Sequence, residues 1–427
     1  MLLATKRLLP LETVGHDLQP ARSLRSNQFN WRHNLLGVWI ALFAIQFGYG
    51  FCAPYVALYL YRDFSVHDPG KLALFTGLVA GSVSLSASLA SPIWGVLGDR
   101  FGRRPMLLRA ISAAGITIVA SGLAPSVGTL VASRVAMGLT SGVNPAGTAV
   151  VAEGTPPTNL SWALGLTSSA RAIGQAVGPM AGALLASFLP LRIVFVFGGL
   201  LVLLALAPVA LIVHEPTPAG TPGERGSVMH AIRGVPSATA RTIVALWACL
   251  GLVFLAVTGM QQLIVLRILS LHIASAAFTT GLAFTVFGIS TALAATQYSR
   301  LIHVTGFKAL AATSAALLAC AIILAAIAPT ATWLVVCSAC AGLTFGAVFP
   351  TLNSMLGLES PARIKATVFG LASSFTSLGN GVGPLAGGAI AAVLGLGWGL
   401  GGLAVACILA GLLVVTVVRE PAVNRVG

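Results

Sequence analysis

Residues 168–186 read SSARAIGQAVGPMAGALLA, and residues 373–391 read SSFTSLGNGVGPLAGGAIA. The two segments are 205 positions apart (373 − 168 = 205), and nine of their nineteen positions are identical. Upstream of each copy, GLTSGVNP at 138–145 corresponds to GLTFGAVFP at 342–350, with one residue inserted. A repeat of this length predicts two halves of the same topology, related by a pseudo-two-fold axis along the membrane normal.

The whole chain is strongly apolar. Of its 427 residues, 57% are hydrophobic and only 8% are charged, which excludes a water-soluble globular fold. A spanning helix needs about 20 mostly apolar residues, and backbone groups in lipid must be satisfied within the segment. We therefore expect an all-α membrane protein with twelve spans at 34–60, 71–97, 106–124, 129–152, 162–188, 191–213, 242–270, 274–298, 308–328, 332–357, 366–394 and 397–418.

The stretch 214–241 is rich in proline, glutamate and arginine and separates six spans from six, so it predicts a linker between two halves. We expect the chain to consist of an N-terminal tail (1–33), a first six-helix half (34–213), the linker (214–241), a second half (242–418) and a C-terminal tail (419–427).

The net charge of +14 comes from 24 Lys and Arg residues against 10 Asp and Glu. Most of the basic residues fall on one side if the N-terminus is cytoplasmic, as the positive-inside rule requires. The topology therefore explains the charge without nucleic acid, and it predicts that both termini, the linker and the loops after even-numbered spans are cytoplasmic.

The loop between the second and third spans reads GVLGDRFGRR at 95–104. Asp99 suits the N-terminus of a helix, where the dipole favours an anion, and the arginines suit carboxylates or lipid phosphates. Positive-inside topology alone explains these arginines, but it explains neither Asp99 nor the glycines.

These residues resemble the major facilitator superfamily, whose signature G-x-L-x-D-R-x-G-R-[KR] the loop matches. Arg134 and Gly138 are similar to the family's second signature, and Gly174-x-x-x-Gly178-Pro179-x-x-Gly182 resembles the antiporter signature. The resemblance covers residues 31–418 and is greatest to drug/proton antiporters of the bacterial twelve-helix type. It implies two pseudo-symmetric six-helix halves that rock to alternate access.

The resemblance also implies a conformational lock. Asp99 is similar to the acid that meets the start of the eleventh span when the protein faces outward, and Arg103 to the base that pairs with an acid at the inner end of the fourth span, here Glu153. The counterpart loop of the second half places His303 where the acid would be, so we expect an asymmetric gate. The residues of this lock are Gly95, Asp99, Arg100, Gly102, Arg103, Arg104 and Glu153.

Gly174, Gly178 and Gly182 recur every four residues and therefore share one face of a helix, which lets a neighbouring helix approach closely. Pro179 adds a bend. Tight packing and a seal against leakage both explain this pattern, which the second half repeats at Gly383 and Pro384.

Charges inside the membrane are costly and mark function. Arg134 matches a family position associated with proton transfer or substrate contact, whereas Arg171 either lines a cavity or extends to the headgroups. None of the ten acids lies mid-span, and the first span carries Gln46 and Tyr49 where related antiporters carry an acid, so we expect neutral or anionic amphiphiles as substrates. The candidate proton and substrate pathway is Arg134, Arg171, Gln46, Tyr49, Asn144, Gln175 and Asn380.

We therefore predict a secondary transporter of the inner membrane that exports lipophilic compounds in exchange for protons, without a metal or cofactor and as a monomer. A facilitator or symporter of a small metabolite on the same fold is the alternative. An enzyme is not expected, because no H-E-x-x-H, G-x-S-x-G or G-x-x-x-x-G-K-[ST] motif occurs.

Overall fold

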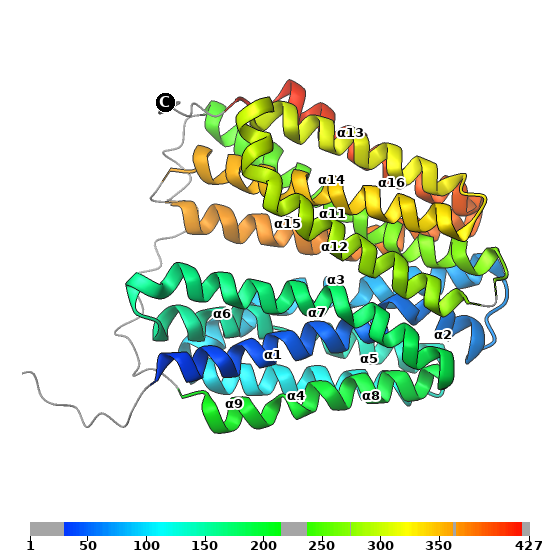
Figure 1. The fold of residues 1–427 in the computed structure, drawn as a ribbon, viewed down its shortest axis with the longest axis horizontal. Helices are drawn as coiled ribbons and strands as arrows, with labels where there is room; N and C mark the ends of the chain where they lie inside the picture. Colours follow the sequence, from blue (N-terminus) through cyan, green and yellow to red (C-terminus); the bar gives the residue numbers. More distant parts are fainter. Residues whose placement is uncertain (1–29, 215–236, 274, 362–363, 421–427) are drawn as a thin grey trace, which may run out of the picture. The chain divides into compact units, whose positions relative to one another are not determined.

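A computed structural model describes residues 30–214, 237–273, 275–361 and 364–420. Most of the two tails and of the linker predicted at 214–241 lies outside these residues. Within them the chain is helical and contains no strand, which confirms the predicted fold class. Figure 1 shows the helices running side by side, with α1 to α9 below and α11 to α16 above.

The first half holds eleven helical segments, of which several are parts of one span. They are α1 (Trp31–Cys52), η1 (Ala53–Tyr55), α2 (Val56–Arg62), α3 (Pro69–Phe101), α4 (Arg103–Gly122), α5 (Val127–Leu139), α6 (Val143–Gly154), η2 (Pro157–Asn159), α7 (Leu160–Phe188), α8 (Leu191–Leu204) and α9 (Leu206–Ile212).

In the second half, six unbroken helices correspond to six spans. They are α11 (Ser237–Ser270), α12 (Ala276–Thr305), α13 (Phe307–Ala326), α14 (Ala331–Glu359), α15 (Lys365–Leu394) and α16 (Leu396–Thr416). We call the end of the bundle where α1 begins and α16 ends the terminus end. It lies at the left in Figure 1, and the other end is the opposite end.

Ten helices among the described residues are long and apolar enough to cross a membrane. α5 is apolar but has only 13 residues. α7 has 29 residues but carries the polar residues described below. The segment α5–α6 and helix α7 occupy the predicted fourth and fifth spans and complete the two sets of six.

The fourth span, predicted as one continuous helix at 129–152, is present but is broken between Leu139 and Val143. Gly142 has φ +132° there, a conformation that L side chains rarely adopt. In the second half the corresponding α14 runs unbroken from Ala331 to Glu359. The first-half sequence GLTSGVNP, which contains the break, is one residue shorter than its second-half counterpart GLTFGAVFP.

The helix ends confirm the repeat. α7 and α15 begin 205 residues apart (365 − 160), and α4 and α13 begin 204 apart (307 − 103). Gly102 and Gly306 end α3 and α12 with φ of 95° and 81°, which favour glycine. Ser126 and Thr330 cap α5 and α14 in the same way, each accepting a bond from the backbone three residues on.

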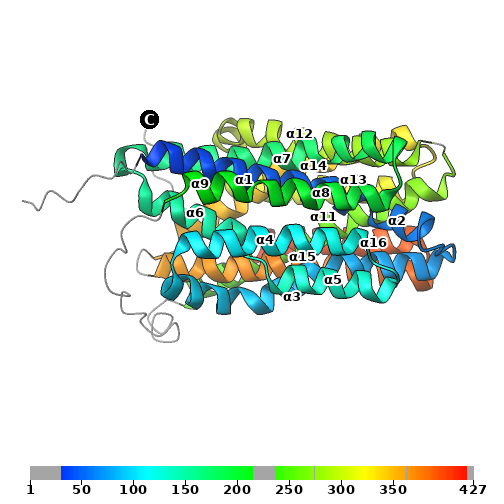
Figure 2. The same cartoon turned by 90° about the horizontal axis from the view of Figure 1, so that it is seen from below.

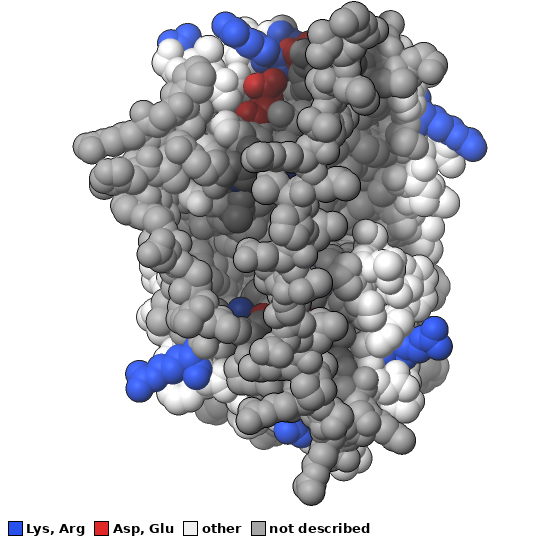
Figure 3. All heavy atoms as spheres, turned by 90° about the vertical axis from the view of Figure 1, so that its left-hand side faces the viewer, with Lys and Arg blue, Asp and Glu red and all other residues white. Residues whose placement is uncertain are grey.

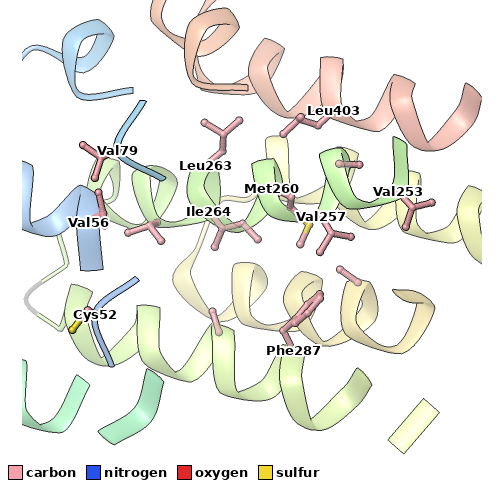
Figure 4. Close-up of a cluster of buried hydrophobic side chains, with 14 of the residues drawn as sticks. Cys52, Val56, Val79, Val253, Val257, Met260, Leu263, Ile264, Phe287 and Leu403 are labelled. Carbon is pink, nitrogen blue, oxygen red and sulfur yellow. The ribbon is translucent and has the colours of Figure 1, made fainter. Parts of the chain in front are cut away.

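Buried apolar side chains from both halves form one cluster. Figure 4 shows Val56 and Val79 of the first half in this cluster with Leu263 and Ile264 of α11. These residues lie in the part of each helix that is nearer the opposite end. The view in Figure 2, turned by 90°, also shows the helices of the two halves running side by side.

Candidate functional site

Helix α7 is held against α1 by the glycine face predicted from the antiporter signature. A Cβ at Gly174 or Gly178 would lie 2.7 Å from the backbone oxygens of Phe43 and Phe47. At Gly182 it would lie 2.5 Å from the oxygen of Phe51. Since real Cβ atoms do not approach this closely, only glycine permits the observed helix separation.

Helix α15 is held against α11 in the same way. A Cβ at Gly379 would meet the oxygen of Gly251, and one at Gly383 would meet that of Leu255. At Gly387 the nearest atoms belong to side chains, Leu403 Cδ1 of α16 at 3.1 Å and Leu263 Cδ1 of α11 at 3.3 Å. Two of the three repeated glycines therefore make the same contact with a facing backbone in both halves.

Helix α7 also touches the second half, through residues near Pro179. The hydroxyl of Thr285 on α12 donates to the Ala176 oxygen at 2.9 Å. A Cβ at Gly281 would lie 2.8 Å from the Pro179 oxygen, which also accepts a hydrogen bond from the hydroxyl of Tyr55. The two halves are thus joined across α7 and α12 by backbone carbonyls next to Pro179.

The pseudo-symmetric contact joins α15 to α3. Gly77, which corresponds to Gly281 (281 − 77 = 204), packs against the Pro384 oxygen, and a Cβ at Gly70 would lie 3.0 Å from the Ala392 oxygen. These close contacts lie in the parts of α3, α7, α12 and α15 that are nearer the opposite end. They form a seal between the halves at that end.

Helix α7 carries two exposed faces of opposite character. Ile173, Val177 and Leu184 are exposed and apolar, as expected for a face in contact with lipid. At 100° per residue, Gln175 lies on the other side of the helix, together with the exposed Ser168 and the half-buried Arg171. This polar strip lies between the faces that pack on α1 and α12.

Helix α15 repeats this arrangement with different residues. Its exposed apolar positions Leu378 and Val382 correspond to Ile173 and Val177 of α7 (each 205 apart). Its polar strip is Ser373, Thr376 and Asn380, at the positions of Ser168, Arg171 and Gln175. The two strips therefore occupy equivalent positions on α7 and α15.

Arg171 is the charged member of these strips. It lies eleven residues after the first residue of α7, about 16 Å along the axis, which is well inside the span. Its Nη2 donates to Ser168 Oγ at 3.1 Å, and no carboxylate pairs with it among the described residues. Arg171 therefore lies on the polar face of α7, and both predicted readings of it stay predictions.

Arg134 is almost completely buried, with an exposed fraction of 2%. It lies over the ring of Phe195 and in electrostatic range of Tyr49, Cys52 and Tyr59. Its Nη1 contacts Met137 Sδ at 3.9 Å, whereas Nε and Nη2 make no hydrogen bond. Arg134 is thus a buried cation inside the first half, whose charge acts on Tyr49 of the first span.

The remaining predicted pathway residues are more dispersed. Gln46 and Tyr49 are half-buried on α1, and Asn144 is exposed on α6. Gln46 lies close to α7, because a Cβ at Gly174 would be 3.0 Å from Gln46 Cβ. No contact in the structure brings Asn144 to the polar strips.

The structure brings together part of the predicted lock. Arg103 Nε and Glu153 Oε1 are 3.0 Å apart, as the resemblance implied. Arg104 Nη2 donates to the Ala210 oxygen at 2.7 Å, and Arg100 lies over the ring of Phe101. Gly95 and Asp99 belong to α3, but the predicted contact of Asp99 with the eleventh span lies outside what the structure describes.

Two residues that the sequence did not single out stabilise the break in the fourth span. Trp94 Nε1 donates to the Leu139 oxygen at 2.6 Å, and Arg109 Nη2 to the Ser141 oxygen at 3.1 Å. Arg109 also stacks over the Trp94 ring, 3.3 Å from its centroid. These groups satisfy carbonyls that an unbroken helix would have used.

A second ion pair lies at the opposite end. Arg192 Nε and Asp63 Oδ1 are 3.6 Å apart, and Arg192 Nη1 also donates to the Ala124 oxygen at 3.1 Å. Burial raises the pKa of Asp63, and the nearby Arg192 and Arg62 offset part of that rise. Among the described residues, no cluster of His, Cys, Asp and Glu could hold a metal ion.

The comparisons with known proteins agree with this geometry. The model of the Major Facilitator Superfamily matches residues 38–275 and 246–427. The chain is 28% identical over 369 residues to the multidrug resistance protein MdtG of Escherichia coli, which covers 86% of this chain and 90% of that protein.

Two solved structures share the fold. A bacterial homologue of the human lysosomal transporter Spinster, in an inward-facing and occupied conformation, has a TM-score of 0.72 at 17% identity, over 90% of this chain and 96% of its own. The human organic anion transporter MFSD10 (TETRAN) has a TM-score of 0.62 at 21% identity, over 90% and 99%.

Proposed function

The chain belongs to the Major Facilitator Superfamily of membrane transporters, and on that premise we propose that it exports lipophilic small molecules in exchange for protons. The similarity to MdtG over most of both chains supports multidrug efflux. The α7 glycine face that resembles the antiporter signature also supports it. Because the family consists of transporters, membership in it gives no support to an enzymatic activity of this chain.

We propose that the terminus end faces the cytoplasm of a bacterial inner membrane. Arg100, Arg103, Arg104, Arg300 and Lys365 all lie at this end, as the positive-inside rule requires. Figure 3 looks onto the terminus end and shows Lys and Arg side chains around its rim. With this orientation, the seal at the opposite end closes the outside, and the polar strips open towards the cytoplasm.

The observation that carries the substrate class is the pair of polar strips on α7 and α15. They offer hydroxyls, two amides and one cation, Arg171, to a molecule between the halves. A carboxylate is absent from both strips, so a cationic substrate would gain no counter-charge there. We therefore assign neutral or anionic amphiphiles, and the Arg171 guanidinium as the group that binds an anionic end.

The residue that we assign to energy coupling is Arg134. A buried cation without a carboxylate partner imposes a positive potential on its surroundings, here on Tyr49 of the first span. We propose that Arg134 and Tyr49 belong to the proton pathway and that Arg171, Gln175 and Asn380 contact the substrate. The Arg103–Glu153 pair acts in the conformational lock at the cytoplasmic end.

The test uses inside-out vesicles with an acidic interior, which contain either the wild type or Arg134→Met. We expect a neutral or anionic lipophilic compound to collapse the pH gradient only with the wild type. Arg134→Met should still exchange labelled against unlabelled compound, because its binding strips are intact. Exchange without any proton movement in the wild type would establish a facilitator instead.

Two further experiments test the expected oligomeric state and the expected position of the chain ends. Light scattering of the purified protein should give the mass of a monomer. Cysteine labelling from either side of the membrane should place both chain ends in the cytoplasm. A labelled terminus on the outside would reverse the proposed orientation and with it the direction of transport.

A further inference from the structure

A cavity of about 480 Å³ lies at the terminus end of the second half, away from the polar strips. It is formed where α11 and α13 begin and where α16 ends, and it is lined by Ala238, Arg241, Lys308 and residues 416–420. Its volume is within the range of small-molecule sites in proteins.

The cavity has an excess of positive charge. Arg241, Lys308 and Arg419 line it, together with one acid, Glu420. That acid is already engaged, because its two oxygens accept the backbone N–H groups of Phe307 and Lys308 at 2.8 and 2.9 Å. Among the described residues, none of the three cations forms an ion pair.

An exposed apolar face leads directly into this cavity. Leu409, Leu412 and Val415 of α16 are exposed by 47%, 53% and 52%, and the next residue, Thr416, lines the cavity. Apolar side chains exposed on a spanning helix contact acyl chains, and the end of such a helix lies at headgroup depth. The cavity and this face together match an amphiphile with an anionic head and an apolar tail.

We propose that the cavity binds the phosphate of an anionic phospholipid, with its acyl chain along the exposed face of α16. Arg241, Lys308 and Arg419 hold the phosphate, as basic pockets between helices hold anionic headgroups on the cytoplasmic side. The bound lipid connects the ends of α11, α13 and α16. The site is separate from the substrate strips, and only the leaflet depends on the proposed orientation.

The first experiment measures lipid retention by the wild type. Native mass spectrometry of the detergent-solubilised protein, with equal phosphatidylglycerol and phosphatidylcholine added, should show preferential retention of one phosphatidylglycerol. Inorganic phosphate at a large excess should not displace it, because it lacks the acyl chain. Equal retention of both lipids, or displacement by phosphate, would overturn the lipid site.

The second experiment removes two charges from the cavity. Arg241→Gln with Arg419→Gln should weaken phosphatidylglycerol binding by about thirtyfold, since each basic residue near an anionic leaflet contributes about a fivefold factor. The matched control is Arg300→Gln with Lys365→Gln, which removes two exposed cations from the same end outside the cavity. Equal weakening by both pairs would indicate general surface attraction and contradict a defined site.

Discussion

Helices α7 and α15, of 29 and 30 residues, both carry a glycine face and a proline, but they differ in the charge of their polar strips. Arg171 of α7 corresponds to Thr376 of α15 (376 − 171 = 205). Elsewhere, Arg134 corresponds to Ser338, and the pair Arg103–Glu153 corresponds to Phe307 and Leu358, at the helix offsets of 204 or 205. The comparison teaches that close packing is kept in both halves, whereas the cations Arg134 and Arg171 have no charged counterpart in the second half.

The largest expected effect comes from moving the charge between the two strips. Arg171→Gln should reduce export of an anionic amphiphile at least about tenfold, since charge-assisted hydrogen bonds are worth about 1.5–3 kcal/mol. Adding Thr376→Arg to that variant should restore part of the binding, because the cation then faces the same space from α15. Transport by membrane vesicles, with KM and maximal rate determined separately, measures both.

A neutral substrate is the control for this swap. Its export should change by less than about threefold in Arg171→Gln, because the amides and hydroxyls of both strips remain. An equal loss for neutral and anionic compounds would mean that Arg171 supports structure or conformational change, and the assignment of an anion site would be wrong.

The glycine faces are expected to be equally intolerant in the two halves. Gly178→Ala and Gly383→Ala should each lower stability by about 1–3 kcal/mol, because the added methyl group meets a backbone carbonyl of the facing helix. The matched controls are Gly165→Ala and Gly370→Ala on the same helices, where no atom lies within 4 Å. These should be neutral or slightly stabilising, since alanine is the better helix former.

Thermal unfolding in detergent, followed by circular dichroism, measures these four variants. A much larger loss for Gly178→Ala than for Gly383→Ala would show that the α7–α1 contact is tighter than its repeat. Loss of stability in the controls would attribute the effect to glycine's backbone freedom and not to close packing.

The lock at the terminus end should affect transport more than stability. Arg103 and Glu153 are partly exposed, so the pair contributes only about 0–1 kcal/mol to folding. Glu153→Gln should nevertheless slow transport severalfold if the pair holds one conformation. Exchanging the charges, with Arg103→Glu and Glu153→Arg together, should recover part of the rate.

The corresponding change in the second half gives the contrast. Leu358 corresponds to Glu153, and Phe307 stands where the first half has Arg103. Leu358→Gln should therefore leave the transport rate near that of the wild type. A rate reduction as large as that of Glu153→Gln would show that the end of the helix matters more than the ion pair.

The sequence predicted the features that depend on repeated local patterns. The glycine faces follow from residues four positions apart, and the Arg103–Glu153 pair follows from a family signature. The break between Leu139 and Val143 was not predicted, because the groups that stabilise it, Trp94 and Arg109, are 45 and 32 residues from the carbonyls they bind. A hydropathy profile does not detect such a break, because the residues at the break are apolar or small.

The bond between Thr285 and the Ala176 oxygen was missed for the same reason. Its partners are 109 residues apart and belong to different halves. One signal in the sequence was available. Thr285 corresponds to Gly81 of α3 (285 − 81 = 204), and its partner Ala176 corresponds to Gly381, which Gly81 contacts. At this position the first half has a glycine that packs closely on a backbone oxygen, and the second half has a threonine whose hydroxyl donates to one.

The smallest expected effect concerns Asp63, which pairs with Arg192 at the opposite end. Burial raises its pKa, so the folded protein binds this proton more tightly than the unfolded chain, whose carboxyl titrates near pH 4. The carboxyl therefore favours the folded state most below that pH, and this contribution is lost as the pH rises through the folded pKa. Asp63→Asn is neutral at every pH, so its melting temperature should exceed that of the wild type at pH 7, and the difference should shrink towards pH 4. A variant that melts below the wild type at pH 7 and approaches it only on acidification would show that attraction to Arg192 outweighs the cost of burial.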